Sequence, residues 1–283
     1  MRFLRIFSVV SLVAGICAGG AAQADERGHA LVLGDSVAFA YIASDGHAYI
    51  NAGNFLGFAD DLEHMLGLEA VNPACPGEAT GSFLSSTAPD NGCRGYRANF
   101  PLHVAYAGTQ GAFATNYLKH HHDVRLITIT LGANDGFLLE EGCATQANPT
   151  LCIEAGVPTL LATVAGNMQI ILAELRATGY GGAIVITTYY STDYSDTAGT
   201  GLTALLNSAV VAPAKAYGAV VADLFSAFER VASKPAFGGK TCNAGLLNAS
   251  AQDQTLCDVH PSQSGQRLIA ETIARAYRRL TDE

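Results

Sequence analysis

The chain has few basic residues and no cluster of them that could cover a nucleic acid. Its 283 residues include 16 Lys and Arg against 25 Asp and Glu, and the basic residues are scattered apart from Arg278-Arg279 near the C-terminus. Binding to a phosphate backbone depends on clustered Lys and Arg that release counterions. The composition therefore excludes nucleic acid as a partner.

The chain also lacks an internal repeat, a linker rich in Pro, Gly or Ser, and any long apolar run after residue 25. Without a linker, the 259 residues that follow residue 24 are expected to form one domain with a sizeable core. A membrane span needs about 20 consecutive apolar residues. We therefore expect no integral membrane association, and a soluble monomer.

The N-terminus carries the pattern of an export signal over residues 1–24. Two Arg residues precede an apolar run from Ile6 to Ala18, and Ala22-Gln23-Ala24 fits a cleavage site. An amphipathic helix or a membrane anchor is the alternative. Cleavage would leave residues 25–283 as the mature domain, with a formal charge of −11 because the signal holds two basic and no acidic residues. A secreted protein, extracellular or periplasmic, is expected.

Six cysteines remain once Cys17 is removed with the signal, and an even number in an exported chain predicts disulfides. Consecutive cysteines fall within the same candidate loop, which favours pairing neighbours among the fifteen possible arrangements. The expected bonds are Cys75–Cys93, Cys143–Cys152 and Cys242–Cys257. A metal site is the alternative, but no CxxC motif or Cys-plus-His spacing supports one, and none is expected.

Short runs rich in Val and Ile alternate with segments of helical period. The expected strands are His29–Leu33, Glu69–Asn72, Leu126–Leu131, Ala183–Thr188 and Ala219–Leu224. The expected helices are Phe55–Leu66, Pro158–Ala177 with Pro158 in its first turn, Leu202–Ala216 and Gln263–Leu280. This alternation predicts an α/β fold with a doubly wound, mostly parallel sheet. Ligands of such sheets bind beyond the carboxyl ends of the strands.

Two polar residues directly follow expected strands at that edge. Ser36 follows the first strand, where its hydroxyl could act as a nucleophile and its N–H could hold an oxyanion. A helix N-cap is the alternative role for Asp35 or Ser36. Asn134 follows the third strand and could point its carboxamide N–H into the cleft, whereas a turn over Asn134-Asp135-Gly136 is the alternative.

Two further positions belong to the same edge. His260, in Asp258-Val259-His260-Pro261, could accept a proton from a serine, although a lone His before a helix is more often only a loop residue. Gly77 follows the second strand, where the absence of a side chain lets a backbone N–H approach an oxyanion. A Pro-Gly turn is the alternative there.

Taken in order, Gly34-Asp35-Ser36, Gly77, Gly132-Ala133-Asn134-Asp135 and His260-Pro261 resemble the four motifs of the SGNH superfamily, also called GDSL lipases and esterases. The resemblance implies a three-layer α/β/α, flavodoxin-like fold with a five-stranded sheet. It also implies Ser36 as nucleophile, His260 as base, and an oxyanion hole made by the amides of Ser36 and Gly77 and the side chain of Asn134. No metal or organic cofactor is implied. The six cysteines are similar to those of secreted, three-disulfide lipases.

The chain departs from the family pattern at two places. Val37 stands where the GDSL motif has Leu. More important, the family acid lies three residues before the His, and here that position is Cys257, with Asp258 only two residues before. Either Asp258 reaches the imidazole along a different backbone path, or a backbone carbonyl near Cys257 orients the ring.

The resemblance implies hydrolysis of carboxylic acyl esters, with a small-molecule or lipid ester as substrate. The sequence leaves open a lipase or short-chain esterase, a polysaccharide O-acetyl esterase, and, in a different class, a non-catalytic binding protein on the same fold. His120-His121-His122 is expected to be a solvated turn and not a metal site. The loop from Tyr189 to Tyr194 either lines a substrate pocket or packs on the domain.

Overall fold

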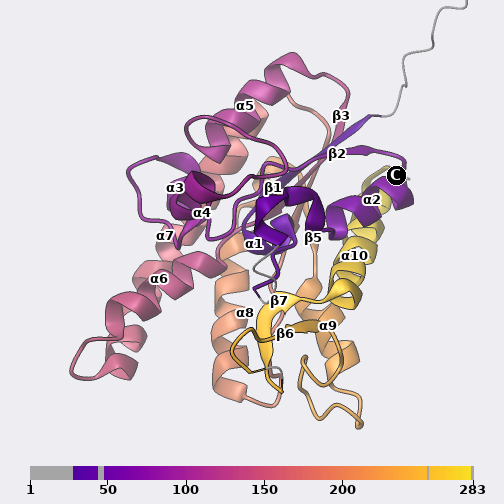
Figure 1. Ribbon diagram of the computed structural model, residues 1–283. Coiled ribbons are helices and arrows are strands. Elements are labelled where there is room, and N and C mark those ends of the chain that lie inside the picture. The colour runs from indigo at the N-terminus through magenta and orange to yellow at the C-terminus, as the bar shows by residue number, and fades with distance from the viewer. Residues whose placement is uncertain (1–27, 44–47, 254, 282–283) are drawn as a thin grey trace, which may run out of the picture.

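The computed structural model describes residues 28–43, 48–253 and 255–281, so the expected export signal and Cys17 lie outside the described residues. Five parallel strands form the central sheet in the order β2-β1-β3-β4-β5 (Figure 1). They are β1 (His29–Gly34), β2 (Glu69–Val71), β3 (Val124–Thr130), β4 (Ala183–Thr187) and β5 (Ala219–Ala222). All five lie where the Val- and Ile-rich runs predicted them, which confirms the parallel sheet.

Helices cover both faces of this sheet. Successive residues of a strand point to opposite faces, and here both sets of side chains are apolar, so both faces must be covered. In β1, Ala30 and Val32 pack into one core cluster and Leu31 and Leu33 into another. The first cluster includes side chains of α2 (Phe58–Leu66), α9 (Leu224–Ala232) and α10 (Gln263–Thr281). The second includes side chains of α5 (Gln110–His120), α7 (Pro149–Ala177) and α8 (Thr197–Val211). The predicted three-layer α/β/α architecture is therefore confirmed.

Shorter elements connect these layers. The α-helices are α1 (Ser36–Phe39), α3 (Thr80–Leu84), α4 (Cys93–Asn99) and α6 (Ala133–Cys143). The 3-10 helices are η1 (Ala48–Ile50), η2 (Ala52–Asn54) and η3 (Ala214–Tyr217). Near the C-terminus, β6 (Leu247–Ala249) and β7 (Cys257–Pro261) form a separate antiparallel pair.

All three expected disulfides are present. Cys75–Cys93, Cys143–Cys152 and Cys242–Cys257 join Cα atoms 5.5, 5.6 and 5.7 Å apart, within the usual range for this bond. Each closes a loop of fewer than 20 residues and restricts the unfolded chain.

The helix expected to start at Pro158 begins at Pro149 instead. The side chain of Asn148 accepts a hydrogen bond from the N–H of Leu151, and Pro149 occupies the first turn, where a missing N–H costs nothing. Pro158 therefore lies inside the helix, where proline is normally unfavourable. The Cys143–Cys152 bond ties the first turn of α7 to the end of α6, which helps to keep this turn helical.

By length and composition, α7 is the one helix among the described residues that could cross a membrane. The expectation that no apolar run after residue 25 reaches that length is therefore wrong for α7. Its second half lies against the sheet, where five of its apolar side chains are buried. These are Val164, Met168, Ile171, Leu172 and Leu175.

The helix expected over Leu202–Ala216 is displaced toward the N-terminus. It begins at Thr197, because the Asp196 side chain accepts a hydrogen bond from the N–H of Ala198 and caps the helix. It ends at Val211, two residues before Pro213, and the 3-10 turn η3 follows. The periodic pattern identified the helix but not its caps.

Candidate active site

The strand order places a topological switch point between β1 and β3, since the chain leaves β1 for β2 on one side and then returns to β3 on the other. Open sheets of this order bind ligands at that point. Ser36 lies two residues beyond the end of β1, and Asn134 lies in the first turn of α6 beyond β3. Both side chains line one cavity of about 300 Å³, and His260 lines it as well.

Ser36 is held by a short helix that starts at the end of β1. The four-residue helix α1 is capped by Asp35, whose Oδ1 accepts a hydrogen bond from the N–H of Val37 at 2.9 Å. The capping role considered for this pair therefore belongs to Asp35. Ser36 stays partly exposed at the cavity wall and its hydroxyl is not used to build the helix.

Asp35 is buried beside the nucleophile candidate, with 1% of its surface exposed. The Tyr189 hydroxyl donates a short hydrogen bond to Asp35 Oδ2. Burial raises the pKa of the Asp35 carboxyl to about 6, even though the hydrogen bonds from Tyr189 and the Val37 N–H favour its charged form. Because its oxygens face Tyr189 and the backbone, Asp35 serves to hold the start of α1 in place.

His260 and Asp258 are joined by a hydrogen bond despite their unusual spacing. His260 Nδ1 lies 2.7 Å from Asp258 Oδ2, and both side chains are 14% exposed. The reason is that this segment is a strand: residues two apart in β7 point to the same face. Although burial raises the pKa of Asp258, its hydrogen bond and charge interaction with His260 bring the pKa below its usual value.

The strand that carries His260 is fixed on several sides. It pairs with β6, and Cys257 is bonded to Cys242. The Tyr190 hydroxyl donates to the carbonyl of Val259 at 2.6 Å. The Tyr41 ring meets the imidazole edge-on, with ring centroids 4.9 Å apart. Asp258 binds Nδ1, so Nε2 is the imidazole nitrogen that remains available. His260 also lines the cavity.

Gly77 lies in a tight turn and not on the cavity wall. It is the third residue of the turn Cys75-Pro76-Gly77-Glu78, with φ of +86°, and a Cβ at this position would overlap with the carbonyl of Asn91. The Pro-Gly turn considered as an alternative is therefore present. The turn is attached to the nucleophile loop by a hydrogen bond from Cys75 N–H to the carbonyl of Gly34 at 3.1 Å. Within the described residues, the Gly77 N–H donates to no other group.

The carboxamide of Asn134 is buried and its orientation is fixed. Its Oδ1 accepts from Asn91 Nδ2 at 2.8 Å, and its Nδ2 donates to the carbonyl of Glu78 at 3.0 Å. The second Nδ2 contact, to Asp35 Oδ2, is 3.5 Å long and therefore weak. One amide hydrogen is thus held only loosely at the cavity wall.

A buried glutamine joins the two loops and was not predicted from the sequence. Gln110 Oε1 accepts from the N–H of Gly34 at 2.7 Å, and its Nε2 donates to the carbonyl of Gly34 at 2.9 Å. The same Nε2 lies 3.3 Å from Glu78 Oε2. Gln110 therefore fixes the peptide before Asp35 and also contacts the residue after Gly77. A single Gln at the start of α5 gives no sequence signal for such a role.

A model of the GDSL-like lipase/acylhydrolase family matches residues 32–268 of this chain. The chain belongs to this family. It is accordingly a carboxylic ester hydrolase of the lipase/esterase type, as the four motifs predicted. A search of curated proteins finds no match.

Solved structures of lipases and esterases share the fold at low sequence identity. A phospholipase A1 from Streptomyces albidoflavus is 19% identical, with a TM-score of 0.53 over 87% of this chain and 98% of its own. A lipase from a goat rumen metagenome is 17% identical, with a TM-score of 0.55 over 89% and 98%. An acetylxylan esterase from Geobacillus stearothermophilus is 13% identical, with a TM-score of 0.52 over 88% and 94%.

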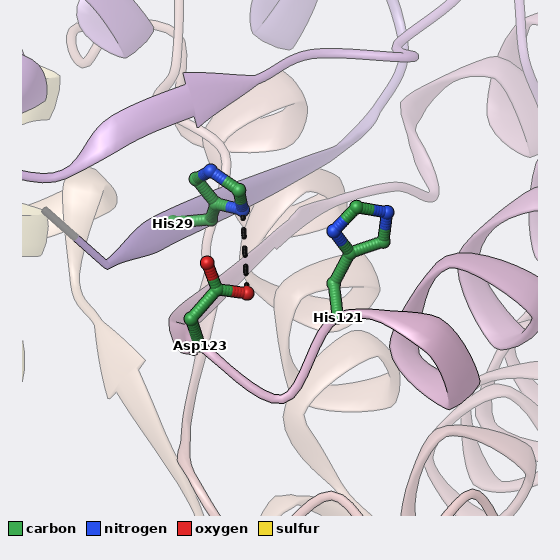
Figure 2. A group of neighbouring side chains, drawn as sticks. All are labelled: His29, His121 and Asp123. Carbon is green, nitrogen blue, oxygen red and sulfur yellow. Dashed lines mark ion pairs between the residues drawn. The ribbon is translucent and has the colours of Figure 1, made fainter. Parts of the chain in front are cut away.

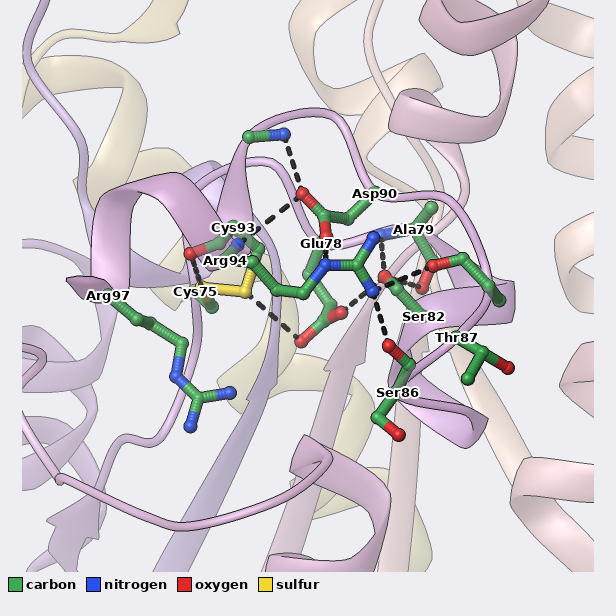
Figure 3. Close-up of polar contacts among 12 residues, drawn as sticks. Cys75, Glu78, Ala79, Ser82, Ser86, Thr87, Asp90, Cys93, Arg94 and Arg97 are labelled. Carbon is green, nitrogen blue, oxygen red and sulfur yellow. Dashed lines mark hydrogen bonds and ion pairs between the residues drawn. A yellow bond between two sulfur atoms is a disulfide. The ribbon is translucent and has the colours of Figure 1, made fainter.

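Glu78 is a buried acid of this GDSL-like chain that the motif comparison does not explain (Figure 3). It lies between the Cys75–Cys93 disulfide and Ser82, whose hydroxyl donates a short hydrogen bond to Glu78 Oε1. Burial raises the pKa of Glu78 to about 7, against the opposing effect of hydrogen bonds from Ser82 and Gln110. The carboxyl group is therefore partly protonated in the folded protein at neutral pH.

This shift predicts a pH-dependent effect of Glu78→Gln. The folded-state pKa lies above that of the unfolded chain, so the native state binds the proton more tightly, and this contribution to stability is lost as the pH rises to about 7. By pH 8 the charged form costs the wild type about 3 kcal/mol, which a neutral Gln avoids. Urea unfolding at pH 4.5 and pH 8 is expected to show the variant gaining about that much relative to wild type. A pH-independent difference would contradict the shift.

Two groups of possible metal ligands occur among the described residues. In the first, Cys75, Glu78 and Cys93, the sulfur atoms are committed to a disulfide. The second consists of His29, His121 and Asp123 (Figure 2), with His29 Nδ1 3.6 Å from Asp123 Oδ1. It lies at the amino ends of β1 and β3, opposite the edge that carries Ser36. The group therefore takes no part in the cavity. His120 is the last residue of α5, and His121 and His122 follow it as exposed residues before β3.

Proposed function

We propose that this hydrolase cleaves esters by a two-step serine mechanism, with Ser36 as nucleophile and His260 as general base. The observation that carries the proposal is the 2.7 Å contact between His260 and Asp258 in a chain whose Ser36 and His260 line the same cavity. A serine becomes a nucleophile when a neighbouring base, itself oriented by a third group, accepts its proton. Asp258 supplies that third group along the same face of β7.

In the first step, Ser36 Oγ attacks the ester carbonyl while His260 Nε2 accepts the hydroxyl proton. The carboxylate of Asp258 holds the Nδ1–H and stabilises the imidazolium that forms. The tetrahedral intermediate then collapses as His260 returns the proton to the departing alcohol, leaving the acyl group on Ser36. Water repeats the sequence against the acyl-enzyme and releases the carboxylic acid.

The negative charge of each intermediate would be stabilised by the N–H of Ser36 and by Asn134 Nδ2, which line the cavity. The N–H of Gly77 would be the third donor, because the next residue, Glu78, is hydrogen-bonded to Asn134 and holds the Gly77 turn beside the wall. Three features support this assignment. Gly77 N–H has no partner among the described residues, its turn is bonded to the nucleophile loop, and the weak 3.5 Å contact of Asn134 leaves one amide hydrogen available. Gln110 and the Cys75–Cys93 bond hold these donors so that they need little rearrangement during reaction.

The proposal extends to export of the protein. The three disulfides support an oxidising compartment, extracellular or periplasmic, since such bonds are rare in the cytosol. The export signal proposed for residues 1–24 would deliver the chain there, to act as a monomer on small-molecule or lipid esters. No residue of the proposed mechanism depends on a metal or organic cofactor.

Pre-steady-state kinetics test the covalent step. Rapid mixing with excess p-nitrophenyl butyrate is expected to release up to one equivalent of p-nitrophenol in a burst, provided that deacylation is the slower step. Acid quenching during turnover, followed by mass spectrometry, is expected to show one butyryl group on the chain. Turnover with no trapped acyl group under any quench condition would contradict the two-step route and favour direct attack by water.

A further inference from the structure

The cavity that contains Ser36 extends along an apolar wall built by three helices. Leu139 comes from α6, Val157 and Leu160 from α7, and Leu206 from α8. All four side chains are only half-buried by the protein, so each keeps apolar surface that faces the cavity. Leu160 and Leu206 also pack against the core cluster on this face of the sheet, which makes the wall continuous with the core.

This wall is a fixed part of the fold. α6 and the first half of α7 project from the body as a hairpin (Figure 1), and the Cys143–Cys152 bond closes its tip. The two helices touch at Gly156, where a Cβ would come within 2.5 Å of Leu139 Cδ1. The absence of a side chain at Gly156 therefore lets Leu139 lie against α7 and shape the cavity.

The volume of the cavity is far greater than an acetyl group requires. One molecule of liquid water takes up about 30 Å³. If each heavy atom of a ligand needs a similar volume, the two carbons of an acetyl group take roughly 60 Å³. The cavity has a volume of about 300 Å³ and also receives the reacting ester group beside Ser36, so the remaining space takes several carbons more than an acetyl group. An acetyl ester would leave most of the apolar wall uncovered.

The charges at the cavity favour an uncharged ligand. Glu140, Asp193 and Asp196 are among the lining residues, and of the described residues no Lys or Arg lines the cavity. Hydrogen bonds from Ser195 hold the pKa of Asp193 below its usual value, so this carboxylate stays charged. A negatively charged chain end would be repelled here, and so would the carboxylate product once it is released.

We infer that the acyl chain of the substrate is uncharged, aliphatic and several carbons longer than acetyl, and that it lies between α6, α7 and α8. The inference rests on the proposed role of Ser36 and adds the substrate class to it. It separates two of the functions that the sequence left open, because an O-acetyl esterase of polysaccharides has no use for this wall. Leu139, Val157, Leu160 and Leu206 are then specificity-determining residues.

A pair of neighbouring leucines gives a matched test. Leu206→Trp fills the cavity, whereas Leu205→Trp adds the same bulk to a side chain that is 51% exposed and does not line it. For the wild type, kcat/KM is expected to be at least about tenfold higher for p-nitrophenyl octanoate than for the acetate. Leu206→Trp is expected to lower kcat/KM for the octanoate about tenfold or more, and kcat/KM for the acetate less than about threefold. Leu205→Trp is expected to change neither.

A third substrate tests the charge. A p-nitrophenyl ester whose eight-carbon acyl chain ends in a free carboxylate is expected to react at least about tenfold more slowly than the octanoate. The inference is overturned if the wild type prefers acetate, if Leu206→Trp lowers all esters in parallel, or if both Trp variants act alike. If Ser36→Ala leaves every ester rate unchanged, it is the proposed function that fails instead.

Discussion

Ser36→Ala is expected to lower kcat for p-nitrophenyl butyrate by about 10⁵-fold or more, with little change in KM. Loss of the nucleophile removes the covalent route altogether, and only binding and oxyanion stabilisation remain. The fold should be unaffected, because Asp35 and not Ser36 caps α1, and Ala is a good helix former. Steady-state kinetics together with a thermal unfolding curve separate the two effects.

A matched control for this variant is available in the same cavity. Ser191 also lines it, but its hydroxyl is bonded to the carbonyl of Asp193 and to Thr200. Ser191→Ala is therefore expected to lower kcat less than about tenfold, through local loss of these hydrogen bonds. The assignment of Ser36 fails if its Ala variant keeps more than about 1% of wild-type kcat, or if Ser191→Ala has the larger effect.

His260→Ala is expected to lower kcat by about 10⁴- to 10⁶-fold, nearly as much as the loss of Ser36. The two residues act as one unit, since an alcohol that cannot lose its proton is a poor nucleophile. His64, on α2 and exposed, does not line the cavity, so His64→Ala controls for removal of an imidazole. The measurement is kcat for the same butyrate ester, with circular dichroism as the check on folding.

Asp258→Asn gives the graded comparison for the same pair. The amide keeps the shape of the carboxylate but loses the charge that holds Nδ1–H and favours the imidazolium, so a fall of about 10²- to 10⁴-fold in kcat is expected. An unchanged kcat in this variant, beside a large loss in His260→Ala, would mean that a backbone carbonyl orients the ring. The assignment of His260 itself fails if His260→Ala and His64→Ala behave alike.

The sheet could be predicted from the sequence because its signal is local. A strand covered on both faces must be apolar throughout, and runs such as Leu126–Leu131 and Ala183–Thr188 show this directly. Helix starts were less predictable. Pro158 has the appearance of a first-turn proline, yet Asn148 caps the helix one residue before Pro149, and periodicity alone does not choose between the two.

The candidate site was likewise only partly predictable from the sequence. The four motifs name Ser36, Gly77, Asn134 and His260, but the partner of His260 depends on backbone geometry: Asp258 reaches it because β7 is extended. Contacts such as Gln110 with Gly34, or Tyr189 with Asp35, join residues 76 and 154 positions apart. A buried polar side chain of this kind carries no periodic or motif signal, and only the folded chain brings the partners together.

The most direct test of the central claim is the site of covalent capture by a fluorophosphonate. Such a probe bonds to a serine only when a neighbouring base activates it, so a non-catalytic binding protein on this fold would not react. Peptide mapping of the labelled protein is expected to place one adduct on Ser36, with labelling abolished in Ser36→Ala and strongly slowed in His260→Ala. An adduct on another residue, or no adduct in a protein that hydrolyses esters, would contradict the account.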